Sequence, residues 1–119
     1  MEKVFMNIRQ RDLLLMPFPY SDLSASKVRP VLVISNDRFN ESSKDLIVCC
    51  VTSNISKTFY TILVGKNSLE EGGLADECCI KVENVAKIDK SKAIKKIGRM
   101  NQKSFSEVRE MFYSLFSSQ

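Results

Sequence analysis

The sequence predicts a small, mostly β fold of the α+β class, in which an antiparallel barrel or sandwich is followed by one amphipathic helix. Short apolar runs bounded by turn residues recur from Leu13 to Ile97, which is typical of antiparallel strands. Near the end of the chain, apolar residues recur instead at helical spacing: Phe105, Val108, Met111, Phe112, Leu115 and Phe116. With 119 residues, 44% of them hydrophobic, the chain can bury one core, so we expect a single domain over residues 1–119.

The expected elements follow from these runs. The pattern predicts strands at residues 12–18, 30–35, 45–52, 59–65, 77–82 and 93–98, with a weaker piece at 85–88. A short helical turn is expected at 36–42. The long helix is expected to begin at Ser104, because Ser104 and Glu107 fit a capping box. Its apolar stripe needs a cover, either the barrel or a partner surface.

Charge is unevenly distributed along the chain. Residues 81–103 carry eight basic side chains against two acidic ones, a net +6, so the remainder carries −2 of the total +4. A polyanion such as nucleic acid suits this segregation, because each neutralised phosphate releases counterions. The alternative is a solvated strand edge whose lysines prevent aggregation.

The residue types present exclude several classes of chemistry. The chain contains no histidine, which removes the commonest general acid/base and metal ligand, and it has no glycine-rich phosphate loop and no G-x-S-x-G elbow. The four cysteines form two adjacent pairs without C-x-x-C spacing, so we expect buried small hydrophobes with one sulfur of each pair facing inward, rather than a metal or redox site. Without an apolar span or signal segment, a cytoplasmic protein is expected.

Polar residues cluster where the expected strands begin or end. If these ends meet at one rim of the barrel, they form a site from Asp22, Arg29, Thr52, Ser53, Lys81 and Glu83. Each also has a purely structural interpretation. Arg29 can form an ion pair with Asp12 or Asp22, Thr52 and Ser53 can close a turn, and Lys81 and Glu83 can lie on a solvated strand face.

Four stretches, in this order, carry a family resemblance: RDLLLMPFPYSDLSASKVRPVLVIS, DLIVCCVTS, GGL, and KKIGRM followed by the amphipathic helix. The most specific parts are P-F-P-[FY]-[ST]-D at residues 17–22, R-P before an apolar strand and T-S after one. From about Arg11 to Phe116, the chain resembles the MazF/PemK toxins of prokaryotic toxin–antitoxin systems. The resemblance implies a small SH3-like barrel, a homodimer, and cleavage of single-stranded RNA without metal or cofactor.

The resemblance also assigns residues. The family's catalytic arginine and threonine fall on Arg29 and Thr52, and an arginine and an aspartate that act in plasmid-borne members correspond to Lys81 and Glu83. We therefore expect Arg29, Thr52 and Glu83 to be catalytic, and the substrate to be bound by Tyr20, Asp22, Lys27, Ser53 and Lys81. In the family a glycine often precedes the aspartate of the opening strand, whereas here Arg11 precedes Asp12.

The chemistry of metal-free RNA cleavage fits these residue types. The ribose 2′-OH attacks its own phosphorus and leaves a 2′,3′-cyclic phosphate and a 5′-OH, so the protein must move protons and stabilise a phosphorane. The forked donors of Arg29 and the hydroxyl of Thr52 suit the phosphoryl oxygens. A guanidinium stays protonated in proteins, so a carboxylate, Glu83 or Asp22, is the better base by type. Tyr20 or Phe18 can stack a splayed base.

The leading hypothesis is a cytoplasmic, homodimeric endoribonuclease toxin that inhibits translation and growth by cutting mRNA. The resemblance further implies a cognate antitoxin whose acidic tail covers the cleft, and operator DNA as a ligand of the toxin–antitoxin pair. Two alternatives remain open on the same barrel: a non-enzymatic gyrase inhibitor like the CcdB toxins, which would act through the C-terminal helix, and an inactive RNA-binding module.

Overall fold

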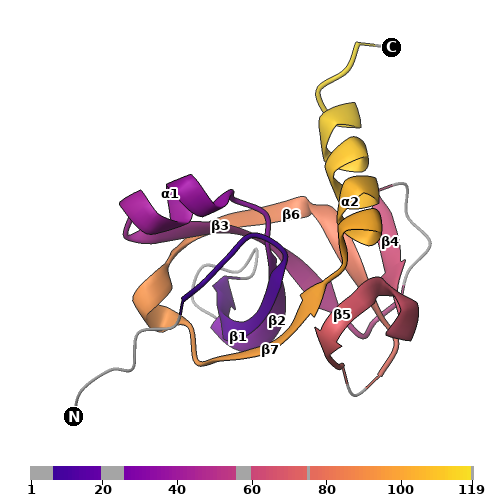
Figure 1. Cartoon of the computed structure of the whole chain (residues 1–119). Helices are drawn as coiled ribbons and strands as arrows, with labels where there is room; N and C mark the ends of the chain where they lie inside the picture. The colour runs from indigo at the N-terminus through magenta and orange to yellow at the C-terminus, as the bar shows by residue number, and fades with distance from the viewer. Residues whose placement is uncertain (1–6, 20–25, 56–59, 75, 119) are drawn as a thin grey trace.

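The computed structural model describes residues 7–19, 26–55, 60–74 and 76–118. Within these ranges seven strands form one antiparallel sheet in the order β4-β6-β3-β2-β1-β7-β5 (Figure 1). The strands are β1 (Asp12–Pro19), β2 (Ser26–Val33), β3 (Asp45–Thr52), β4 (Thr61–Val64), β5 (Leu69–Gly72), β6 (Cys78–Asp89) and β7 (Lys95–Met100). The helices are α1 (Asp37–Ser42) and α2 (Gln102–Ser114), with single 3-10 turns η1 (Lys66–Ser68) and η2 (Lys90–Lys92).

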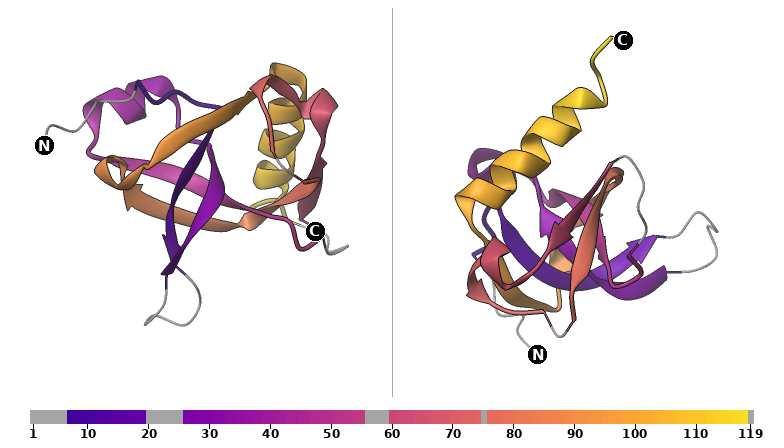
Figure 2. Two further views of the ribbon diagram at one scale, coloured as in Figure 1. Left: turned by 90° about the horizontal axis from the view of Figure 1, so that it is seen from below. Right: turned by 90° about the vertical axis from the view of Figure 1, so that its right-hand side faces the viewer.

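The curled sheet buries apolar side chains on both of its faces. Adjacent residues of one strand enter different clusters: Leu13 packs beneath α2, whereas Leu14 packs on the other face. This alternation follows from the two-residue period of a strand. Phe105 and Val108 are buried in the first cluster, and Met111, Phe112 and Leu115 further along the chain pack against it. The C-terminal end of α2 projects away from the sheet (Figure 2). Of the two covers expected for the helical stripe, the barrel is therefore the one that most of the stripe uses.

All four cysteines are free and buried, as expected for small hydrophobes. The expectation that only one sulfur of each pair faces inward was wrong, because both faces of the sheet are covered. Cys49 belongs to the cluster beneath α2 and Cys50 to the opposite cluster. Burial raises the pKa of the Cys49 thiol to about 12, with smaller contributions from Cys50 and Glu83.

Several element boundaries differ from those expected. β2 begins at Ser26 rather than at Pro30, so Arg29 lies within the strand. The two pieces expected at 77–82 and 85–88 form the single strand β6, which carries a bulge. The short strand β5 was not predicted. The N-cap of helix α2 lies three residues earlier than the capping box indicated, because the side chain of Asn101, not that of Ser104, caps the helix by accepting from Ser104 N at 2.9 Å.

An ion-pair network joins β1, β5 and β7. Asp12 is fully buried, and its carboxylate lies 3.3 Å from Lys96 Nζ and 3.6 Å from Arg99 Nε. Lys96 also contacts Glu71 at 2.6 Å, and this hydrogen bond raises the pKa of Lys96 and lowers that of Glu71. Glu70 contacts Arg11 and Arg99. These contacts hold the edge strand β5, which has little apolar surface of its own.

Neither of the two helices within residues 7–19, 26–55, 60–74 and 76–118 is long and apolar enough to cross a membrane. The same ranges contain no group of three or more histidine, cysteine, aspartate or glutamate side chains that could hold a metal ion.

Candidate active site

One face of the sheet carries three of the expected site residues, Arg29, Thr52 and Lys81. Cys50 on β3 pairs with Lys81 on β6, and Lys81 pairs with Thr61 on β4. Residues opposite one another in an antiparallel pair project on the same face, so these three side chains form a row. A second row runs parallel to it, since Thr52 pairs with Cys79 and Cys79 pairs with Leu63.

Arg29 lies at the end of this second row. The β2–β3 pairing reaches Val31, opposite Cys50, and two residues further along each strand stand Arg29 and Thr52. Their positions place both side chains on the face that carries Lys81. The pairing with β3 begins only after Pro30, which has no N–H to donate, so the two strands separate where Arg29 stands.

Three charged side chains lie close enough to Cys50 to influence its thiol. The positive charges of Arg29 and Lys81 and the negative charge of Glu83 all act on its thiol. Burial is the largest influence and raises the pKa of Cys50, whereas Arg29 and Lys81 oppose this and Glu83 adds to it. The buried thiol thus lies within reach of the charges of a guanidinium, an ammonium and a carboxylate.

Glu83 owes its place to the bulge in β6. Cys50 pairs with Lys81 but the preceding Cys49 pairs with Val85, so residues 82–84 have no partner of their own in β3. Glu83 is exposed within this bulge, and its charge acts on both Cys49 and Cys50. Bulges re-aim side chains, and here the Glu83 carboxylate comes close enough to act on the Cys50 thiol, on which Lys81 also acts.

The Thr52 hydroxyl serves two roles at once. Its Oγ1 accepts a hydrogen bond from Asn54 N at 3.1 Å, which closes the turn after β3 as the structural interpretation predicted. A hydroxyl that accepts one bond retains its proton for donation, so Thr52 can still donate to a substrate oxygen. Thr52 is partly exposed, so that proton is accessible.

The remaining expected site residues have different outcomes. Lys27 and Ser53 are exposed, and they stand two residues before Arg29 and directly after Thr52 in the sequence. Lys27 lies opposite Phe18 in the β1–β2 pair. Phe18 is only 3% exposed and packs in the core, so its expected role in base stacking was wrong. Tyr20 and Asp22 lie outside the described residues.

Thr61 and Leu63 were missed in the sequence. Both lie on β4 at the edge of the described sheet and end the two rows of the site face. Leu63 is 59% exposed despite its apolar side chain. A strand pattern gives alternation but not register, and only the pairing with β6 shows that these residues face the site.

The basic segment contributes less to the site than its charge suggested. Lys96 and Arg99 bind carboxylates of the ion-pair network, and Lys90 Nζ donates to the carbonyl of Asn40 at 2.6 Å, at the end of α1. Asp12, which the sequence offered as a partner of Arg29, instead contacts Lys96 and Arg99. Arg29 lies on β2 opposite Met16, which is four residues beyond Asp12 on β1. Of the eight basic residues, Lys81 is the one that this geometry assigns to the site face.

Sequence comparison identifies the family. Residues 9–116 match the PemK-like, MazF-like toxins of type II toxin–antitoxin systems. The chain belongs to this family. A relative, the endoribonuclease MazF9 of Mycobacterium tuberculosis, is 29% identical over 98 residues, which cover 77% of this chain and 80% of the relative. The expected family and the expected enzyme class, endoribonuclease, are confirmed.

Solved MazF structures have the same fold. A MazE–MazF structure from Deinococcus radiodurans has a TM-score of 0.75 at 18% identity and covers 96% of this chain and 100% of that one. An endoribonuclease in complex with its cognate antitoxin, from a mycobacterial species, has a TM-score of 0.72 at 11% identity over 94% of this chain and 99% of that one. These matches confirm the predicted β architecture with a C-terminal helix.

Proposed function

We propose that this MazF-like toxin cuts single-stranded RNA, mRNA above all, without a metal ion and thereby inhibits translation and growth. One observation carries the proposal. A single sheet face presents the Arg29 guanidinium and the Thr52 hydroxyl in one row and the Lys81 ammonium in the next, with the Glu83 carboxylate beside them. Donors for a phosphate and a proton acceptor for a ribose hydroxyl are thus side by side.

In the proposed mechanism, Glu83 takes the proton of the ribose 2′-OH as the oxygen attacks the neighbouring phosphorus. Arg29 binds two non-bridging oxygens with its forked donors, and Thr52 donates its hydroxyl proton to the same phosphoryl group. The bond to the 5′ oxygen breaks, and this oxygen leaves with a proton, for which the Lys81 ammonium is the donor on this face. The products are a 2′,3′-cyclic phosphate and a 5′-OH.

The proposed partners follow from the family and its solved structures. One solved relative is an endoribonuclease in complex with its cognate antitoxin, which supports a cognate antitoxin for this chain. We propose that its acidic tail competes with RNA for the face around Arg29. A homodimer, operator DNA bound together with the antitoxin, and action in the cytoplasm complete the proposal.

A CcdB-like gyrase inhibitor is the second candidate, because α2 exposes apolar side chains beyond its packed turns. Tyr113 is 66% exposed and Phe116 is 76% exposed. Such side chains suit a protein partner. In that case growth inhibition would survive Arg29→Ala and be lost with Tyr113→Ser and Phe116→Ser.

The decisive experiment incubates the purified protein with a long single-stranded RNA in EDTA. The expected result is cleavage that leaves 2′,3′-cyclic phosphate ends, reduced at least about 100-fold in Arg29→Ala and less in Arg29→Lys, which keeps the charge but not the fork. Lys92→Ala, on the exposed turn η2, is the matched control and should cut normally. Intact RNA with the unaltered protein, or cleavage that needs added Mg²⁺, contradicts the proposal.

A further inference from the structure

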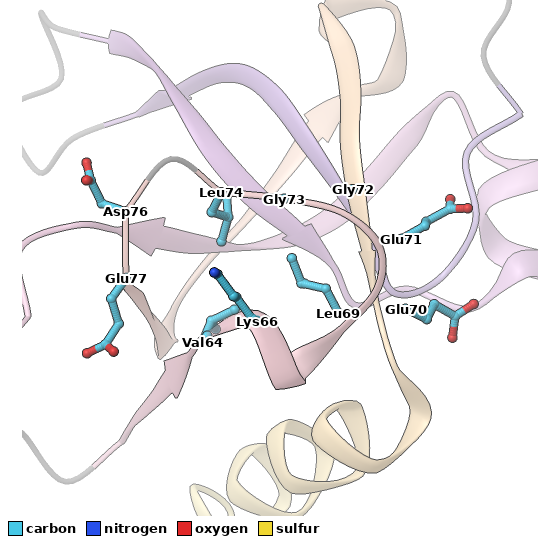
Figure 3. A pocket seen from close by; sticks show the side chains of 11 residues that line it. Val64, Lys66, Leu69, Glu70, Glu71, Gly72, Gly73, Leu74, Asp76 and Glu77 are labelled. Atoms are coloured by element: carbon cyan, nitrogen blue, oxygen red, sulfur yellow. The ribbon is translucent and has the colours of Figure 1, made fainter.

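A second concave surface lies away from the RNA-facing residues, at the end of the sheet where β4 and β5 approach each other. It is a pocket of about 650 Å³ formed by the end of β4, η1, β5 and the segment leading to β6. Pockets that bind ligands commonly have volumes of this order. Val64, Leu69 and Leu74 turn their side chains toward its centre (Figure 3). The proposed catalytic mechanism does not use it.

The charges around the pocket come from one lysine and two groups of carboxylates. Lys66 points its side chain into the pocket (Figure 3). Glu70 and Glu71 point away from its centre and pair with arginine and lysine side chains of the ion-pair network (Figure 3). Asp76 and Glu77 lie together at the opposite side, are exposed, and form no ion pair with any described residue. These two carboxylates repel the phosphates of RNA and favour a cation next to the apolar floor.

Two glycines in the wall point independently to a ligand. Gly72 must be glycine, because its φ is +73° and a Cβ there would lie 2.2 Å from Ile97 O. Gly65 and Gly73 have neither constraint, since neither has a positive φ and an added Cβ would meet no atom within 4 Å. Glycine weakens chain segments, and where the fold does not require it, close approach by another backbone is a common reason for it.

We infer that this pocket binds an extended, cationic segment of a partner protein, with an apolar side chain on the Leu69–Leu74 floor, a Lys or Arg at Asp76 and Glu77, and its backbone against Gly65 and Gly73. The contact is separate from the proposed RNA site. Val64 and the neighbouring Leu63 lie on opposite faces of β4, one toward the pocket and the other on the site face. The toxin can therefore hold such a segment while Arg29 faces RNA.

The test uses the blocked hexapeptide ALKLKA as the probe, with ALQLQA and ALELEA as matched controls. Amide and methyl NMR signals of Gly65, Gly73, Leu69 and Leu74 should shift with ALKLKA, less with ALQLQA, and least with ALELEA. The double variant Asp76→Asn/Glu77→Gln should weaken ALKLKA binding about fivefold, as expected for two exposed ion pairs. Lys66→Gln removes the cation that points into the pocket and should therefore strengthen ALKLKA binding.

Variants that fill the pocket complete the design. An added Cβ at Gly65 or Gly73 meets no atom within 4 Å, so Gly65→Leu and Gly73→Leu should fold with an unchanged melting temperature but lose the peptide. Glu107→Gln/Glu110→Gln, which removes two carboxylates from α2, should bind it normally. Equal binding of ALELEA, unchanged affinity in the Asp76/Glu77 variant, or no shifts at millimolar peptide overturns the inference. So do shifts of the same signals caused by RNA or by raising the toxin concentration. RNA cleavage by these variants is a separate measurement, so the two proposals fail independently.

Discussion

Arg29 illustrates how neighbouring residues decide what a side chain can do. Pro30 has no N–H for the ladder to β3, and pairing with β3 begins only at Val31. On its other side Arg29 is still paired with Met16, a fully buried residue. The guanidinium therefore stands on a backbone that is fixed on one side and open on the other. This combination of rigidity and access is what a phosphate-binding residue needs.

Arg11 has a strained backbone, so its glycine variant should be more stable than its alanine variant. Its φ is 80°, a conformation that disfavours side chains with a Cβ, and it stands where the family often has glycine. Arg11→Ala and Arg11→Gly both lose the 2.7 Å contact with Glu70, but only glycine relieves the strain. We expect Arg11→Gly to be about 1 kcal/mol more stable than Arg11→Ala in urea unfolding. At Lys103, within α2, the alanine variant should instead be more stable than the glycine variant. If glycine is the more stable at both positions, Arg11 is not strained.

Cys49 should make stability fall at high pH. Below 9.0, the ordinary pKa of the thiol, Cys49 is protonated in both the folded and the unfolded chain. Between that value and about 12 only the unfolded chain ionises at this position, so the folded state loses stability as the pH rises. The loss is about 1.4 kcal/mol by about pH 10. The measurement is the drop in the free energy of unfolding between about pH 8 and about pH 10. This drop should be larger in the unaltered protein than in Cys49→Ala by about 1.4 kcal/mol. Parallel curves would contradict the prediction.

At the level of elements, mutations at the start of α2 can distinguish two candidate N-cap residues, Asn101 and Ser104. Asn101 accepts from Ser104 N and also donates to the carbonyl of Asn67 at 2.7 Å. Asn101→Ala should cost about 1 kcal/mol in the free energy of unfolding, whereas Ser104→Ala should change it by less than about 0.5 kcal/mol. Asn101→Asp keeps the capping oxygen but loses the donor to the Asn67 carbonyl, so it should recover only part of the loss. A larger loss of stability in Ser104→Ala than in Asn101→Ala would show that Ser104 caps the helix, as the sequence indicated.

The elements differ in how well the sequence predicts them, for physical reasons. Strand β3 was expected at its observed bounds, and β1 to within one residue, because their apolar runs are long and clearly bounded. Strand β5 has the sequence LEEG, with one apolar residue, and depends on distant ion-pair partners that local patterning cannot show. The site divides in the same way. The family resemblance indicated Arg29 and Thr52, whereas Thr61 and Leu63 depend on strand register.

At the scale of the whole molecule, the net charge overstates the surface available to RNA. Lys96 and Arg99 neutralise carboxylates that hold β1, β5 and β7 together, and Lys90 closes the end of α1. The same sheet carries Arg29 and Lys81 on its site face and two carboxylates at the rim of the pocket near β4. The fold thus sorts its charges into an internal set, a basic set on the site face and an acidic set beside the pocket, which a sum over the chain does not distinguish.

This sorting predicts a shallow salt dependence of RNA binding. If Lys27, Arg29 and Lys81 contact phosphates, log K for a single strand should fall with log salt with a slope of about −2, whereas phosphate contacts from all eight basic residues of 81–103 would give about −6. A 2′-O-methyl RNA, which lacks the attacking hydroxyl, permits the measurement on the active protein. Arg29→Ala and Lys81→Ala should each make the slope shallower by about 0.7, and Lys92→Ala should leave it unchanged. A slope near −6, or an equal effect of Lys92→Ala, would show that RNA follows the basic segment rather than the site face.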